Sequence, residues 1–292
     1  MTTPLYFLSG PTASGKTDLA HTLADQMSLR LLSVDSMMVY RGMNIGTAKP
    51  SDEEIEKYDY AGLNLVDPST PFSVGDWLRT IQKQLDGRPT LAVGGTGLYF
   101  RAITSGLEEQ EVATPSDLPS DIQGLQQRLQ KADPKALSQL SDPENPRRLE
   151  RAIAWREAGL PLPHSWSAPD FPIPVLRRDP QELATRIHQR VIQMMDQGLL
   201  EETQTLLDAG SLTGTATQAI GYAEATALLR GTLSKEEAIE KIATRTRQYA
   251  KRQRTWFRNQ MKSEWIQNKN KQTALDDIQN VWEQTGPYLF VQ

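Results

Sequence analysis

The segment at residues 5–17 constrains the fold more than any other part of the chain. An apolar run at residues 5–8 leads into a turn that is bounded by Gly10 and Gly15 and ends in Lys16 and Thr17. This order matches the phosphate-binding P-loop, whose glycines let backbone N–H groups converge on phosphate oxygens at the start of a helix. Leucine and alanine then repeat at helical spacing, so the sequence predicts strand, loop and helix in succession.

The predicted phosphate-binding set is the loop itself. Its members are Gly10, Pro11, Thr12, Ala13, Ser14, Gly15, Lys16 and Thr17. The lysine contributes a point charge, and the threonine hydroxyl is the candidate ligand for Mg²⁺. A P-loop is typical of nucleotide-binding and ATP-binding proteins, but the motif does not identify the phosphate compound.

Short apolar runs alternate with helical patterns in the first hundred residues, which indicates a parallel sheet with crossover helices. The runs at 31–34 and 90–93 are the second and third predicted strands. Asp35 follows the second, where α/β proteins bind ligands, so it is a candidate for chemistry; a turn cap is the alternative. The glycines at 94–97 allow close approach of a ligand or of a neighbouring element, or form a plain turn. The fold class is therefore α/β, a P-loop NTPase-like parallel sheet flanked by helices.

Composition limits the remaining possibilities. The chain has 292 residues, a hydrophobic fraction of 38%, a mean hydropathy of −0.51 and no cysteine. No apolar run reaches the length of a membrane span, and no secretory leader precedes the first strand, so we expect a cytoplasmic protein without a membrane partner. The missing cysteines exclude disulfides and thiolate zinc sites.

The character of the sequence changes between residues 110 and 174. Ten prolines divide this stretch into short helical segments, such as 122–131 and 147–158. We interpret it as a helical insertion between a first core segment, 1–109, and a helical remainder of the core, 175–262. The last thirty residues, 263–292, are expected to form a tail with one helix at 274–283.

Two helices after the insertion carry notable cations. Arg186 and Arg190 lie one turn apart in the predicted helix 182–197 and can point at a common anion. A capping box at Ser234 opens a long helix with seven Lys/Arg and no acidic residue between 241 and 258. Helical spacing predicts that Tyr249 and Trp256 pack inward while the cations form a stripe, which either binds a polyanion or is simply solvated.

Several runs in one order carry a family resemblance. Beside the P-loop and Asp35-Ser36, they are the stretches at 40–50, 71–74, 94–99, 218–222 and 249–258. Together, over residues 4 to 260, they resemble the bacterial tRNA dimethylallyltransferases, the tRNA isopentenyl transferase family. The resemblance implies transfer of a five-carbon prenyl group from dimethylallyl diphosphate to the exocyclic amine of the adenosine 3′-adjacent to the anticodon.

The resemblance also assigns roles to residues. It implies that Asp35 is the base that accepts the amine proton, with Thr12 and Lys16 as further catalytic residues. It implies that the insertion grips the anticodon stem-loop of tRNA and that the protein acts with Mg²⁺; we expect a monomer. The implied tRNA-binding residues are Asp35, Ser36, Met37, Met38, Thr96, Arg147, Arg148, Arg151, Arg247, Lys251 and Arg252.

The chain departs from the family pattern at three places. Met38 stands where the family usually has glutamine, and Pro180 stands where an arginine is common, so Arg177 or Arg178 would have to replace that arginine. Pro172 and Pro174 interrupt a segment that is usually a strand. A small-molecule P-loop kinase is the alternative function, and an RNA-binding module without chemistry is the third.

Overall fold

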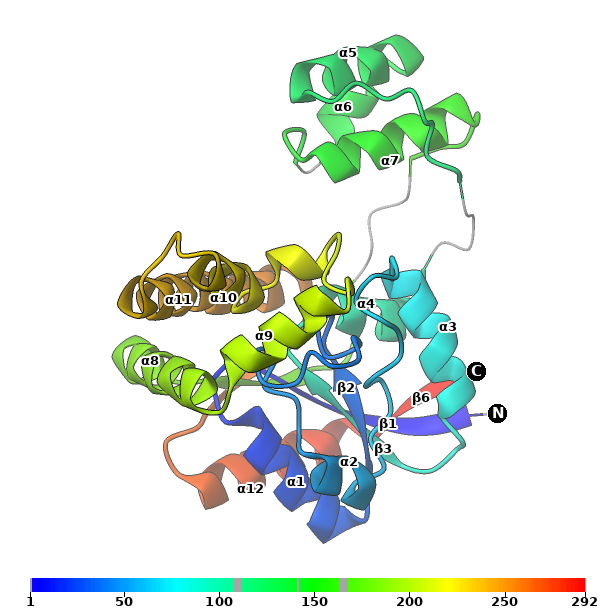
Figure 1. Cartoon of the computed structure of the whole chain (residues 1–292). Helices are drawn as coiled ribbons and strands as arrows, with labels where there is room; N and C mark the ends of the chain where they lie inside the picture. The colour runs from blue at the N-terminus through cyan, green and yellow to red at the C-terminus, as the bar shows by residue number, and fades with distance from the viewer. Residues whose placement is uncertain (1, 108–111, 141, 163–167, 292) are drawn as a thin grey trace. The chain divides into compact units, whose positions relative to one another are not determined.

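The computed structural model describes residues 2–107, 112–140, 142–162 and 168–291, and it divides into two compact units (Figure 1). The larger unit combines Met1–Gly106 with Ser167–Gln292, and the smaller one is Leu107–Trp166. The predicted start of the insertion at residue 110 lies outside the described residues. Its predicted end at 174 falls within the larger unit.

A sheet with parallel main strands forms the centre of the larger unit, which confirms the predicted fold class. Its strands are β1 Thr2–Ser9, β2 Arg30–Val34, β3 Thr90–Gly94, β4 Ile173–Arg177, β5 Ser263–Gln267 and β6 Tyr288–Val291. The order is β2-β3-β1-β4-β5, and β6 pairs antiparallel with β1. Ser9 and Val34 are both register partners of Gly94. Three strands therefore end at the same level, and the loops that follow them meet at one edge of the sheet.

Helices cover both faces of this sheet (Figure 1). Those of the larger unit are α1 Lys16–Met27, α2 Asp52–Lys57, α3 Val74–Gln84, α4 Gly97–Ser105, α8 Pro180–Asp196, α9 Leu199–Asp208, α10 Tyr222–Leu229, α11 Lys235–Gln260 and α12 Lys271–Thr285. On one face, Leu19 of α1 and Ile278 of α12 share a core cluster with Leu8. Phe7, the next residue back along β1, packs with Phe100 of α4, whose ring lies 5.5 Å from that of Phe257 on α11. Neighbouring residues of a strand point to opposite faces, so α4 and α11 belong to the second face. No helix in the described ranges is long and apolar enough to cross a membrane.

The smaller unit is helical, with α5 Ile122–Ala132, α6 Ala136–Gln139 and α7 Pro146–Glu157. Leu125 and Leu129 of α5 pack against Leu149 and Ile153 of α7 in a core of their own. The predicted helices at 122–131 and 147–158 are confirmed to within one residue.

The C-terminal thirty residues are not the tail that the sequence suggests. They add β5, α12 and β6 to the larger unit, and the Trp282 indole N–H of α12 donates to the Phe7 carbonyl at 3.1 Å. The strand preferences of the residues do not indicate either strand, because each is short and has only one buried residue, Ile266 in β5 and Phe290 in β6.

The strand β4 forms despite Pro174. Ile173 donates its N–H to the Lys262 carbonyl beside β5, so alternation along the strand turns the nitrogen of residue 174 towards β1. On the β1 side, the pairing begins only with Ser9 and Val175. The missing N–H of Pro174 therefore removes no hydrogen bond between the two strands.

The long helix α11 begins as predicted, with the Ser234 hydroxyl accepting from the Glu237 N–H at 3.1 Å. Its packing face differs from the prediction by one position. The buried residues are Ala238, Ile242, Ala243, Ala250, Gln253 and Phe257. Trp256 is half-buried, with its ring 5.2 Å from that of Phe257, and Tyr249 lines a pocket, so neither of these two predicted residues belongs to the buried set.

Candidate active site

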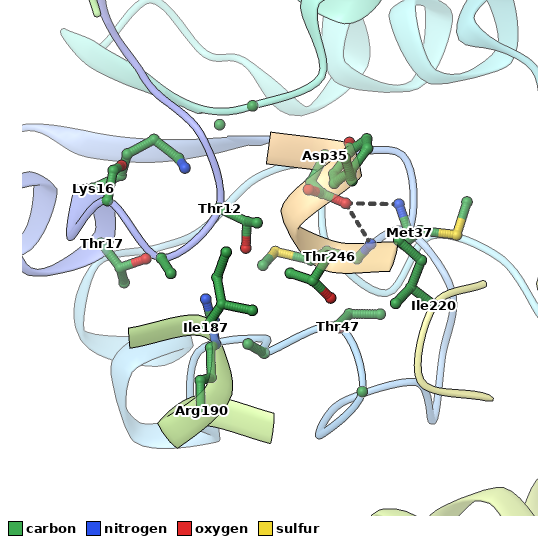
Figure 2. Close-up of a pocket in the computed structure, with 18 of the residues that line it drawn as sticks. Thr12, Lys16, Thr17, Asp35, Met37, Thr47, Ile187, Arg190, Ile220 and Thr246 are labelled. Atoms are coloured by element: carbon green, nitrogen blue, oxygen red, sulfur yellow. Dashed lines mark hydrogen bonds between the residues drawn. The ribbon is translucent and has the colours of Figure 1, made fainter. Parts of the chain in front are cut away.

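One pocket of about 780 Å³ lies where the carboxyl ends of β1, β2 and β3 meet, and all its lining residues belong to the larger unit. The P-loop and Asp35 line it (Figure 2). Helices α8 and α11 supply the facing wall, with Ile187 and Arg190 from the former and Thr246 from the latter. The strand-end position predicted for the site is confirmed.

Backbone conformation explains the glycine at the end of the P-loop. Gly15 caps α1 in the left-handed region, at φ 92°, which side chains with a Cβ rarely adopt. Ala13 has φ 62°, and the Ser14 N–H donates to the Pro11 carbonyl at 3.2 Å. The loop is thus wound tightly around the start of the helix.

Residues from the second half of the chain hold the P-loop from outside. The Ser14 carbonyl accepts from Arg178 Nε at 2.9 Å and from Asn268 Nδ2 at 2.8 Å, and the Ala13 carbonyl accepts from Arg186 Nε at 3.0 Å. Arg177 and Arg178 do not line the pocket, whereas Arg186 and Arg190 do. Of these four arginines, only the two on α8 are therefore available to an anion in the pocket. Pro180 is compatible with this helix, because it follows the Asp179 N-cap in the first turn, where a backbone N–H has no partner within the helix.

The pocket concentrates positive charge at its P-loop end. Lys16 Nζ donates to the Pro11 carbonyl at 2.8 Å. Burial, together with the nearby Arg190, lowers the pKa of Lys16 to about 7, although Asp35 acts in the opposite direction. Burial likewise lowers the pKa of Arg190. Cations that lose hydration in this way gain most from an anionic ligand.

Asp35 is a turn cap and also a pocket residue. Its Oδ1 accepts from the N–H of Met37 at 2.8 Å and of Met38 at 3.3 Å (Figure 2). Its Oδ2 accepts no hydrogen bond within the described part of the chain. The cap that the sequence left as an alternative is therefore real, while one carboxylate oxygen stays available for chemistry.

Three of the other predicted tRNA-binding residues near Asp35 line the pocket, and the fourth contacts one of them. Ser36, Met37 and Met38 line the pocket. Thr96 is outside the lining and accepts from the Ser36 N–H at 3.2 Å. The Met38 sulfur accepts from the Ser33 hydroxyl of β2 at 3.5 Å.

The glycines in the turn after β3 let the side chains of α11 approach the backbone closely. A Cβ on Gly95 would lie 2.2 Å from Gln253 Nε2, and one on Gly97 would lie 2.0 Å from the Trp256 ring. Gln253 accepts from the Thr12 N–H at 2.9 Å and donates to the Gly95 carbonyl at 3.0 Å, and it therefore joins α11 to two walls of the pocket. Sequence reasoning missed this residue, although the run at 249–258 contained it.

The predicted tRNA-binding cations lie on two helices. Arg147, Arg148 and Arg151 are exposed on α7 of the smaller unit. On α11, Lys251 and Arg252 are exposed, and Arg252 also lines the pocket, 5.7 Å from the Tyr249 ring. The remaining cation, Arg247, forms an ion pair with Glu240 at 2.8 Å.

Comparisons with known proteins agree on one family. Residues 38–260 match the family model described as IPP transferase, and residues 3–63 match that of isopentenyl transferase. The tRNA dimethylallyltransferase of Synechococcus sp. (strain RCC307) is 37% identical over 290 residues, which cover 95% of this chain and 97% of that protein.

Solved structures give the same result. The full-length tRNA isopentenylpyrophosphate transferase from Bacillus halodurans superposes with a TM-score of 0.69 at 33% identity, covering 96% of this chain and 97% of that one. A eukaryotic dimethylallyltransferase solved acting on tRNA has a TM-score of 0.73 over 97% of this chain and 77% of its own. At 23% identity, this second likeness shows the fold alone.

Proposed function

The chain belongs to the IPP transferase family, and on this premise we propose that it transfers a dimethylallyl group from dimethylallyl diphosphate to tRNA. The acceptor is the exocyclic amine of the adenosine 3′-adjacent to the anticodon. The observation that carries the proposal is one pocket that combines a P-loop, two arginines of α8 and the free Oδ2 of Asp35. The expected cytoplasmic location and monomeric state stay predictions.

The P-loop end suits the leaving group. As the allylic C–O bond breaks, negative charge gathers on the departing diphosphate and positive charge on the five-carbon group. Lys16, Arg186, Arg190 and the loop amides provide fixed positive charge and hydrogen-bond donors for the diphosphate. The apolar side chains of Ile187 and Val191 line the same pocket and suit a hydrocarbon chain.

Asp35 suits the acceptor. An adenine amine is a weak nucleophile, because its lone pair is delocalised into the ring, so a base must take its proton as the C–N bond forms. Oδ2 can accept that proton while Oδ1 keeps the turn in place. The bond balance is then complete: the C–O bond breaks, the C–N bond forms and the proton moves to Asp35.

Mg²⁺ fits the P-loop end because the ion prefers hard oxygen ligands. The Thr17 hydroxyl is exposed at the start of α1 and makes no hydrogen bond within the described ranges. Those ranges contain no cluster of three acidic, histidine or cysteine side chains that could hold an ion alone. Thr17, phosphate oxygens and water would hold it, and it would add positive charge beside the leaving diphosphate.

Affinity for a diphosphate should weaken as pH rises above about 7. The pKa of Lys16 is lowered to about 7, and a bound anion favours the charged amine, so binding takes up a proton. Above the pKa of the free protein, affinity should fall by up to about tenfold per pH unit. Calorimetry with a substrate analogue that carries sulfur at the bridging position measures this affinity.

The Lys16→Met variant is the control, because the analogue itself also ionises. The ratio of the wild-type to the variant association constant isolates the lysine, and it should decrease from pH 7 to pH 9. A ratio that stays constant over this range would contradict proton uptake by Lys16.

The cations of α11 are proposed to contact tRNA phosphates. Each phosphate neutralised on single-stranded or looped RNA changes the slope of log affinity against log salt by about 0.7. The double variant Lys251→Gln/Arg252→Gln should therefore bind tRNA more weakly and flatten the slope by about 1–2 units, as measured by filter binding over a salt series.

A matched pair on other elements controls for the loss of two charges. Lys83 and Lys269 are exposed on α3 and just before α12, and neither lines the pocket. Replacing both with glutamine should leave the slope nearly unchanged. Equal slopes in the wild type and the α11 variant would mean that this helix presents only a solvated face.

A further inference from the structure

The carboxylate of Glu202, on α9, collects hydrogen bonds from a loop at the edge of the pocket. The N–H groups of Asn44 and Ile45 donate to Oε2 at 3.0 and 2.9 Å, and that of Gly46 donates to Oε1 at 3.2 Å. The Tyr222 hydroxyl donates to Oε1 at 2.6 Å. Three successive backbone donors around one anion form a nest, and hydrogen bonds to a charged acceptor are stronger than neutral ones.

The same contacts fix the path of the loop at residues 44–48. A Cβ on Gly46 would lie 2.4 Å from the ring of Tyr222, so only glycine lets the loop reach the carboxylate. The Tyr222 ring is fully buried, and this burial raises the pKa of its hydroxyl, which therefore stays a donor. Lys49 also contacts the loop, by donating to Asn44 Oδ1 at 2.9 Å.

Glu202 thereby supports two segments that line the pocket. Gly46, Thr47 and Ala48 belong to the loop, and Ile220 lies two residues before Tyr222. Figure 2 shows Thr47, Ile220 and Met37 at the end of the pocket away from Lys16 and Thr17. The supported wall is therefore remote from the phosphate end.

We propose that Glu202 is a positioning residue that builds the acceptor side of the pocket, against which the target nucleobase docks. The proposal rests on the function proposed above. With the diphosphate at the P-loop, the amine can reach Asp35 only from the side away from Lys16, and that side is the wall held by Glu202. A displaced wall misplaces the amine relative to Asp35 and leaves the phosphate end unchanged.

Steady-state kinetics with Glu202→Gln test this role. The amide offers one acceptor oxygen instead of two and brings an NH₂ group against backbone donors. Because a small misplacement of a reacting group costs rate steeply, kcat/KM for tRNA should fall by about tenfold or more. Affinity for the bridging-sulfur analogue should stay within about twofold, since the P-loop end is unchanged.

Two further variants make the result specific. Glu201→Gln removes the same charge one residue earlier on α9, where the exposed side chain takes no part in the nest, and it should behave like the wild type. Tyr222→Phe removes one donor and leaves the backbone contacts, so it should give a smaller loss for tRNA in the same direction.

Amide hydrogen exchange tests the contact without any assay of activity. Peptides covering residues 43–50 should exchange faster in Glu202→Gln by about tenfold, while peptides from the rest of α9 keep their protection. Unchanged protection of the loop, or kcat/KM for tRNA within twofold of the wild type, would overturn the proposal. So would an equal loss for both substrates together with a lower melting temperature, which would make Glu202 a residue of the fold. A wild-type protein that leaves tRNA unlabelled would instead contradict the proposed function, and exchange would still decide whether Glu202 holds the loop.

Discussion

Replacing Lys16 with alanine should lower kcat/KM for prenyl transfer by about 10³-fold, or about 4 kcal/mol of transition-state stabilisation. The amine is enclosed in the pocket, where its contact with a departing phosphate is charge-assisted and little screened by water. No other cation belongs to the P-loop, because the arginines of the pocket come from α8 and α11. Single-turnover transfer of labelled dimethylallyl diphosphate to tRNA measures the effect.

Lys271→Ala is the matched control for this variant. Lys271 is an exposed lysine on α12 that pairs with Asp18 at 2.9 Å and does not line the pocket. It should keep nearly the wild-type rate. A Lys16→Ala rate within tenfold of the wild type would show that the lysine is not needed for the leaving group.

Asparagine at position 35 should reduce the single-turnover rate by about 10²-fold or more, with tRNA affinity nearly unchanged. The amide can still accept from the Met37 and Met38 N–H groups, so the turn is kept. What disappears is the basic oxygen at the Oδ2 position. Filter binding and a melting curve of the variant should match those of the wild type.

Asp35→Ala separates the two roles of this side chain. It removes the cap as well as the base, so the melting temperature should fall together with the rate, because two backbone donors lose their acceptor. Should Asp35→Asn instead transfer label at the wild-type rate, the side chain would be a cap alone and another group would have to take the amine proton.

The sequence predicted those parts of the site that depend on local patterns. The spacing of Gly10, Gly15 and Lys16 defines the P-loop by itself, and the level ends of parallel strands bring Asp35 beside it. The spacing of residues along α8 is a local pattern in the same sense. It predicts that Arg186 and Arg190 lie one turn apart on the same side of the helix.

The residues that the sequence did not reveal act across long separations. Gln253 contacts the Thr12 N–H 241 positions away, and Glu202 contacts the Ile45 N–H 157 positions away, so no periodicity links the partners. On α11, the aromatic side chains at 249 and 256 suggested the packing face, but the buried stripe follows Ala250, Gln253 and Phe257. Burial of a glutamine is favourable here only because both ends of its amide find partners, which tertiary structure alone decides.

Transfer of label from dimethylallyl diphosphate to unmodified tRNA tests the central claim most directly. The purified protein is incubated with Mg²⁺, tRNA and the labelled diphosphate, and in parallel with labelled ATP and small hydroxyl acceptors. We expect label in tRNA on the adenosine 3′-adjacent to the anticodon, mapped by nuclease digestion, and none in a tRNA with guanosine at that position. ATP-dependent phosphorylation of a small acceptor, with no label entering tRNA, would contradict the account and identify a P-loop kinase instead.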